Sequence, residues 1–104
     1  MNQPLQGEVW WGESPDAKGR PYLIVTRDQA IAVLATVVVA PVTRTIRGIP
    51  TEVRLGGPEG LPVESVAAMD ALTTFPKSML VRRMGDLGPR RHELCSALGA
   101  STDC

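Results

Sequence analysis

The chain has 104 residues, of which 43% are hydrophobic and 21% are charged, and its formal net charge at pH 7 is zero. This length is typical of one domain with a modest core, so we expect a single domain over residues 1–104. The neutral charge excludes the overall basic character of many nucleic-acid-binding proteins. No segment has the composition of a membrane-spanning helix or a secretion signal, which predicts a cytoplasmic protein with no membrane contact.

Ten glycines and nine prolines divide the chain into short segments, a pattern typical of small barrels and sandwiches. Apolar alternation and β-branched runs predict six strands, at residues 7–12, 20–26, 36–42, 51–55, 65–69 and 80–87. Segment 20–26 is apolar on both faces and therefore belongs at the centre of the sheet. The expected fold is mainly β, an SH3-like small barrel of five to seven short strands that ends in a C-terminal α-helix.

Two helical segments are expected between and after these strands. Residues 28–34 predict one or two helical turns with Asp28 as the N-cap. Residues 89–98 predict the C-terminal helix, because a Gly-Pro pair begins it and a glycine follows it. One face of that helix, available for the core or for a dimer contact, carries Leu94, Cys95 and Leu98.

The residues that usually hold metals and cofactors are sparse. Cys95 and Cys104 are expected to be reduced thiols, because the chain lacks an export signal. The single histidine, His92, stands among charged residues and is expected to face solvent. Cysteine, histidine and carboxylate residues show no metal-ligand spacing, and no glycine-rich phosphate loop is present. We therefore expect no metal and no cofactor.

Polar groups at the ends of two predicted strands suggest a phosphate site. Arg20 opens one apolar strand, and Thr43 follows another. RNA carries its own nucleophile, the 2′-hydroxyl, so side chains that stabilise a phosphorane and serve the leaving group can cleave it. A guanidinium matches two phosphate oxygens, and a threonine hydroxyl adds a neutral donor. On the residues alone, Arg20 could equally form an ion pair with Glu13 or Asp16, and Thr43 could be an ordinary strand residue.

Basic residues gather in two stretches despite the zero net charge. Five lie between residues 77 and 91, beside a single acid. A second basic group consists of Arg44, Arg47 and Arg54. The loop residues Arg44, Thr45 and Arg47 either contact phosphates and bases or form an exposed turn. Trp10 and Trp11 point to opposite faces of a regular strand. One of them therefore belongs in the core, and the other packs in an interface or stacks on a base.

Six segments, in order along nearly the whole chain, match one family pattern. They are Gly7-Glu8-Val9-Trp10-Trp11, Arg20-Pro21 through Asp28, Val37 through Ile46, Pro50-Thr51-Glu52-Val53, Ser65 through Thr74, and Leu80 through Leu87. In their order and spacing they resemble the MazF/PemK family of toxin endoribonucleases. The loop at 13–19 is shorter than its family counterpart, which leaves the general base open among Glu13, Ser14 and Asp16.

The resemblance implies the toxin of a type II toxin–antitoxin system. Such a toxin cleaves single-stranded RNA at a short sequence, without metal or ribosome, and leaves a 2′,3′-cyclic phosphate and a 5′-hydroxyl. It implies that Arg20 and Thr43 are catalytic, with Arg20 in an electrostatic role because a guanidinium is a poor base. The implied partners are messenger, ribosomal or transfer RNA, a cognate antitoxin protein and a second copy in a homodimer. The candidate substrate-binding residues are Ser14, Lys18, Arg44, Thr45 and Arg47.

Two other functions stay open at this point. A CcdB-like toxin, which poisons gyrase without cleaving anything, shares the barrel but depends on residues of its C-terminal helix. Arg20 and Thr43 favour the nuclease over that alternative. A catalytically inactive family member that only binds RNA is the other alternative, and the shortened loop at 13–19 keeps it open.

Overall fold

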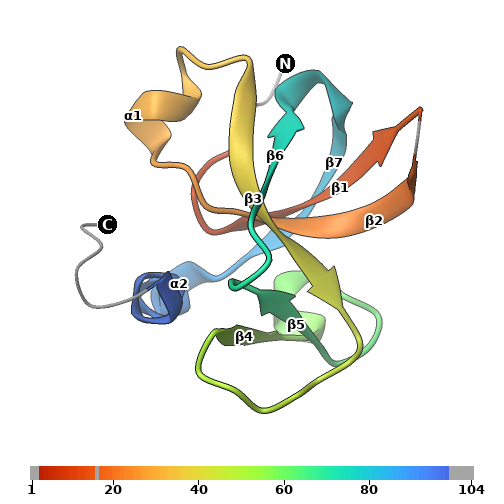
Figure 1. Cartoon of the computed structure of the whole chain (residues 1–104), viewed down its shortest axis with the longest axis vertical. Coiled ribbons are helices and arrows are strands. Elements are labelled where there is room, and N and C mark those ends of the chain that lie inside the picture. The colour runs from red at the N-terminus through yellow and green to blue at the C-terminus, as the bar shows by residue number, and fades with distance from the viewer. Residues whose placement is uncertain (1–2, 16, 99–104) are drawn as a thin grey trace.

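The computed structural model describes residues 3–15 and 17–98. Within them, seven strands form one curled sheet (Figure 1). The same residues contain two α-helices, and the second of these is the C-terminal element. The strands are β1 (Glu8–Ser14), β2 (Ala17–Ile24), β3 (Thr36–Thr43), β4 (Glu52–Leu55), β5 (Ser65–Ala68), β6 (Thr73–Pro76) and β7 (Leu80–Asp86). The helices are α1 (Asp28–Ile31) and α2 (Arg91–Leu98), with short 3₁₀ turns at Gly57–Glu59, Lys77–Met79 and Gly88–Arg90. The predicted mainly β barrel-like fold with a C-terminal helix is confirmed.

Strand β3 connects the two halves of the sheet. The strand order is β4-β5-β3-β2-β1-β7, and every neighbouring pair is antiparallel. The N-terminal half of β3 pairs with β6, whereas its last residues, Val42 and Thr43, pair with Ala67 and Val66 of β5. Strand β3 therefore passes from one pairing partner to the other along its length (Figure 1). Thr43 is its last residue.

The central strands are buried on both faces, as their two-sided apolar sequence predicts. One hydrophobic cluster includes Leu23 and Ala40 and packs against β4, β5 and Leu94 of α2. The second cluster lies on the other face of the same two strands and includes Ile24 and Val39, with residues from α1 and β6. Burial on both faces fixes the register of β2 against β3, because a one-residue slip exchanges the two sets of side chains. The strand ends that hold the candidate residues are thereby held in place.

The structure differs from the prediction at α1 and β6. Arg27 is the N-cap of α1, and Asp28 is already helical. The Asp28 carboxylate instead accepts a hydrogen bond from the Gln6 N–H at 2.7 Å, so the predicted cap is wrong because a distant backbone group takes its oxygen. Strand β6 was not predicted, since Phe75 is its single buried residue and its pairing with β3 comes from tertiary contact.

The C-terminal helix packs on the protein's own core. Leu94 is fully buried, and Cys95 and Leu98 are partly buried against the same cluster. Cys95 is disulfide-bonded, so the predicted thiol at this position is wrong, and Cys104 lies outside the described residues. That prediction assumed a reducing environment, and such an assumption does not determine whether a particular sulfur atom is bonded. None of the described helices is long and apolar enough to cross a membrane.

Candidate active site

A cleft of about 820 Å³ opens where β3 leaves the sheet. Its walls come from β2 and the end of β3, from the loop after β3, from residues 60–63 and 65, and from the paired strands β1 and β7. Four of the seven residues proposed from the sequence line it: Arg20, Thr43, Arg44 and Thr45. The structure therefore brings together the two candidate catalytic residues, which are 23 positions apart in the chain.

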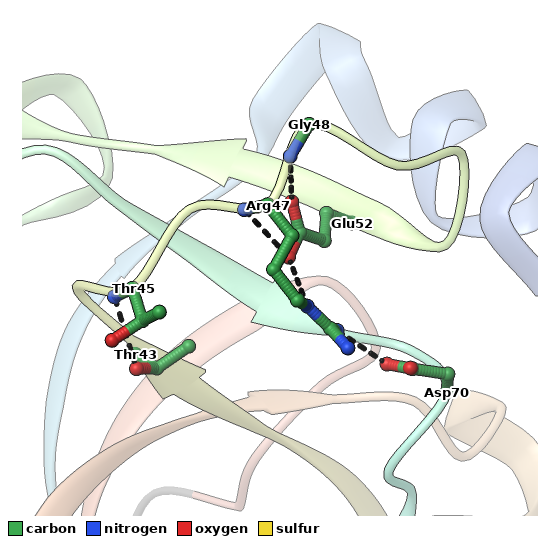
Figure 2. A network of polar contacts seen from close by, with 6 residues as sticks. All are labelled: Thr43, Thr45, Arg47, Gly48, Glu52 and Asp70. Atoms are coloured by element: carbon green, nitrogen blue, oxygen red, sulfur yellow. Dashed lines mark hydrogen bonds and ion pairs between the residues drawn. The ribbon is translucent and has the colours of Figure 1, made fainter.

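Thr43 presents an oriented hydroxyl at this cleft. Its side-chain oxygen accepts a hydrogen bond from the Thr45 N–H at 3.1 Å (Figure 2). A threonine hydroxyl has two lone pairs and one proton, so this contact leaves the O–H free to donate. Thr43 is half-buried and ends a paired strand, which limits its movement. The residue can therefore serve as a fixed neutral donor.

Arg20 reaches across to β3. Its Nη2 donates to the carbonyl oxygen of Val42 at 3.3 Å, and Val42 directly precedes Thr43. The alternative ion pair with Glu13 is not formed, and the Glu13 carboxylate accepts a hydrogen bond from Trp11 Nε1 at 2.9 Å. Asp16, the other alternative partner, lies outside the described residues. A guanidinium has five N–H donors, so most of those of Arg20 stay available to a ligand. Its side chain is exposed at the cleft, and its charge has no described carboxylate partner.

The cleft has an excess of positive charge. Arg20, Arg44 and Arg82 line it, and none of the described lining residues is acidic. No ion pair joins any of these three guanidinium groups to a described carboxylate. By contrast, several arginines outside the cleft are in ion pairs: Arg47, Arg54, Arg83 and Arg90. Uncompensated cations in a concave, partly apolar site favour an anionic ligand.

Arg82 and Trp11 belong to the cleft, although sequence reasoning did not place them there. Trp11 of β1 lies opposite Arg82 of β7 on one side and Pro21 of β2 on the other. Trp10 is 6% exposed and packs in the core, so the prediction that one tryptophan is a core residue is confirmed. Because side chains alternate along a strand, the sequence could have predicted that Arg82 and Arg83 point to opposite faces of the sheet. Only the pairing of β7 with β1 shows that Arg82 is the one that faces the cleft.

Arg47 lies outside the cleft and holds the loop after β3. Its Nε donates to Glu52 at 2.9 Å, and its Nη2 donates to Asp70 at 3.0 Å (Figure 2). Glu52 also accepts from the backbone N–H groups of Arg47, at 3.1 Å, and Gly48, at 2.9 Å. The guanidinium points toward Asp70 and not toward Thr43 (Figure 2). Arg47 therefore supports the segment that carries Arg44 and Thr45.

These contacts shift the pKa values of all three charged groups. Hydrogen bonds to Asp70 and Glu52 raise the pKa of Arg47. The hydrogen bond from Arg47 lowers the pKa of Asp70. Burial pushes the pKa of Glu52 upward, but the hydrogen bonds from Arg47 and Gly48 together bring it below its ordinary value. All three groups are therefore charged at neutral pH.

Ser14 and Lys18 lie apart from the cleft. Ser14 pairs with Ala17 at the end of the β1–β2 hairpin, and Lys18 follows on β2 with an exposed side chain. Neither residue lines the cleft. The hairpin projects from the rest of the sheet (Figure 1). The substrate contacts expected from these two residues are therefore not preformed in this structure.

The wall of the cleft at residues 60–63 is fixed from behind. Gly60 has a φ of +88°, and a Cβ there would lie 2.0 Å from the carbonyl oxygen of Met84 on β7. A Cβ on Gly85 would lie 2.3 Å from the carbonyl oxygen of Glu59. Only glycines permit this close contact between two backbones. The Glu59 side chain, 6% exposed, also accepts a hydrogen bond from Arg90 at 3.0 Å.

The arrangement offers positive charge and hydrogen-bond donors rather than a metal centre. Among the described residues, no group of three or more histidine, cysteine, aspartate or glutamate side chains could hold a metal ion. The guanidinium of Arg20 and the hydroxyl of Thr43 can instead donate to an oxyanion in the cleft. Such donors suit a phosphodiester whose charge increases in the transition state.

Comparisons with known proteins identify the family of this chain. Residues 5–99 match the family described as PemK-like, MazF-like toxin of type II toxin-antitoxin system. The chain is 39% identical over 103 residues to probable endoribonuclease MazF5 of Mycobacterium tuberculosis, across 97% of this chain and 94% of that protein. The Mycobacterium tuberculosis toxin MazF-mt6 has a TM-score of 0.78 and 35% identity, and the match covers 88% of this chain and 91% of that one. A mycobacterial endoribonuclease solved in complex with its cognate antitoxin has a TM-score of 0.78 and 29% identity, covering 91% and 90%. The chain therefore belongs to the family of PemK-like, MazF-like toxins of type II toxin–antitoxin systems.

Proposed function

We propose that this chain is an endoribonuclease toxin that cleaves single-stranded RNA in the cleft at the end of β3. The proposal rests on three arginines of the cleft, Arg20, Arg44 and Arg82, which have no carboxylate partner among the described residues. They share the cleft with the Thr43 hydroxyl, whose O–H remains available to donate. Relatives named endoribonucleases are 39% identical over nearly the whole chain. The toxin acts in the cytoplasm, where its RNA substrates are found.

The reaction is a transesterification within the RNA. The 2′-oxygen attacks the neighbouring phosphorus, a P–O2′ bond forms and the P–O5′ bond breaks. The products are a 2′,3′-cyclic phosphate and a 5′-hydroxyl, so one proton leaves the 2′-oxygen and one reaches the 5′-oxygen. Arg20 donates to the phosphorane oxygens, where its charge-assisted hydrogen bonds strengthen as negative charge develops. Thr43 adds a neutral donor, and Arg44 and Arg82 hold flanking phosphates.

The protein works with two protein partners in this proposal. One is a cognate antitoxin, as in the mycobacterial complex that this chain resembles. The other is a second copy of the chain in a homodimer. Sedimentation at micromolar concentration then gives about twice the mass of 11.2 kDa. A monomer at that concentration contradicts the dimer and leaves the assignment of the cleft to be tested separately.

The cleavage experiment uses three changes in the protein or the substrate. Arg20→Ala removes the charged donor, and we expect the rate to fall by about two to three decades, or roughly 3–4 kcal/mol. Thr43→Val keeps the β-branched shape and removes only the hydroxyl, so the rate falls while the melting temperature stays close to that of the wild type. An oligonucleotide with 2′-deoxyribose at the scissile position is not cleaved by the wild type, because it lacks the nucleophile.

Arg54→Ala is the matched control for these variants. Arg54 pairs with Glu64 on the surface and does not line the cleft. This variant should cleave RNA at the wild-type rate. Cleavage at the wild-type rate by both cleft variants, or any cleavage of the deoxy substrate, contradicts the proposed site. A wild-type protein that inhibits gyrase and cuts no RNA identifies the non-enzymatic toxin instead.

A further inference from the structure

We propose that a second cleft, beside β7, binds the nucleotides that flank the cleaved bond, so that the RNA site extends through Arg82 into both clefts. This inference rests on the proposed function. The second cleft has a volume of about 720 Å³ and is lined by residues of β7, of the turn before it and of the N-terminal segment. Arg82 lines both clefts. A phosphate at Arg82 therefore lies at their junction.

The charge of the second cleft suits a polyanion. Its lining includes Lys77, Arg82 and Arg83, and none of the described lining residues is acidic. Lys77 Nζ donates to the carbonyl oxygen of Ile31 at 2.7 Å and to the side chain of Gln3 at 3.3 Å. Both acceptors are neutral, and no ion pair joins this ammonium to a carboxylate in the part of the chain that the structure describes. Arg83 contributes less, because it is bound to Glu8 at 2.8 Å and also pairs with Asp86.

The surface between these cations is apolar. Val81 is 56% exposed and lines the second cleft together with Pro4, Trp10 and Leu80. Proteins that bind single-stranded nucleic acid combine cations along the phosphate backbone with apolar or aromatic surface under the bases. Val81 follows Leu80 and directly precedes Arg82 in the chain, which places an apolar contact next to the shared guanidinium. A strand of RNA fits this pattern better than an acidic protein segment, because each nucleotide repeats a base beside a phosphate.

The test compares short and long RNA. The probes are fluorescent oligonucleotides of about four and about ten nucleotides, with 2′-deoxyribose at the scissile position so that they bind without being cut. We expect the longer probe to bind wild-type protein about tenfold more tightly, because it alone fills both clefts. Val81→Glu places a negative charge in the second cleft. It should remove most of that gain and leave binding of the short probe within about twofold.

Val33→Glu is the matched control. Val33 is 82% exposed and lies in the turn after α1, where it lines neither cleft. Ser78→Asp, at another exposed lining position, repeats the test in case Val81→Glu lowers the melting temperature. Equal binding of the two probes by wild-type protein, or equal effects of Val81→Glu and Val33→Glu, overturns the inference. A lower sedimenting mass of Val81→Glu also overturns it, because the face is then an interface between copies.

Failure of this inference can be told apart from failure of the proposed function. Cleavage of the short all-ribose substrate by wild-type protein depends only on the first cleft. If that substrate is cleaved and the longer probe binds no more tightly, the second cleft is not an RNA site and the nuclease assignment stands. If neither probe binds and nothing is cleaved, both proposals fail.

Discussion

The indole of Trp11 lies directly over Gly19, in space that any larger residue at position 19 would need for its side chain. A Cβ on Gly19 would lie 2.4 Å from Trp11 Nε1, well inside van der Waals contact. The two residues come from neighbouring strands, β1 and β2, and Nε1 is also held by Glu13 at 2.9 Å. Gly19 therefore gives Trp11 a defined position at the wall of the cleft.

Replacement of Gly19 tests whether that position matters for RNA. We expect Gly19→Ala to displace the indole and raise KM for RNA several-fold, while stability changes by no more than about 1 kcal/mol. Tryptophan fluorescence reports the displacement, since Trp10 stays buried as an internal reference. Gly57→Ala is the control, because nothing lies within 4 Å of a Cβ at that exposed position. An unchanged KM in Gly19→Ala excludes a role for the Trp11 indole in binding.

The ion pair between Arg90 and Glu59 should support the wall of the cleft at residues 60–63. Arg90→Met leaves the buried Glu59 carboxylate with only the Gly56 N–H, at 2.7 Å, as a described partner. We expect a loss of about 1.5–3 kcal/mol in the free energy of unfolding and a higher KM, measured by denaturant titration and by initial rates. Arg54→Met breaks the exposed pair with Glu64 and should cost less than about 1 kcal/mol. Equal losses in the two variants contradict a special role for the buried pair.

The cluster around Arg47 predicts a dependence of stability on pH. The pKa of Glu52 and that of Asp70 are lowered in the folded protein. A carboxylate with a depressed pKa stabilises the fold above its ordinary pKa of about 4, and that stabilisation is lost as pH falls through the folded-state value. Wild-type protein should therefore melt at a higher temperature than Glu52→Gln at pH 7, and the difference should shrink below about pH 4. A constant difference across this range is the contrary result.

Chelation should leave cleavage unchanged. In the proposed reaction, Arg20 supplies the positive charge and the RNA supplies the nucleophile, so no step draws on a divalent ion. Initial rates with and without EDTA, on protein first dialysed against the chelator, make the measurement. Activity that disappears with EDTA and returns with magnesium overturns the mechanism.

The sequence predicted the strands whose own residues determine them. Strand β2 is apolar on both faces, so its central place follows from its composition, and β3 was predicted as a strand from its β-branched residues. Strand β6 was missed because its exposed threonines carry no such signal and its pairing depends on β3. The placement of Arg20 beside Thr43 was suggested by family motifs. The role of Arg47 could not be predicted, since one of its two acidic partners, Asp70, is 23 residues away and meets it only in the folded chain.

The contacts of Gly60 with β7 and of Glu59 with Arg90 also set the order in which the site is completed during protein synthesis. During synthesis, a domain generally folds as a unit. Arg20 and Thr43 are made in the first half of translation, but the wall at 60–63 has no support until Gly85 and Arg90 have been added. A nascent or truncated chain that ends before β7 therefore carries both candidate catalytic side chains without a finished cleft. The cell that makes the toxin is exposed to a complete site only when synthesis of the chain is nearly finished.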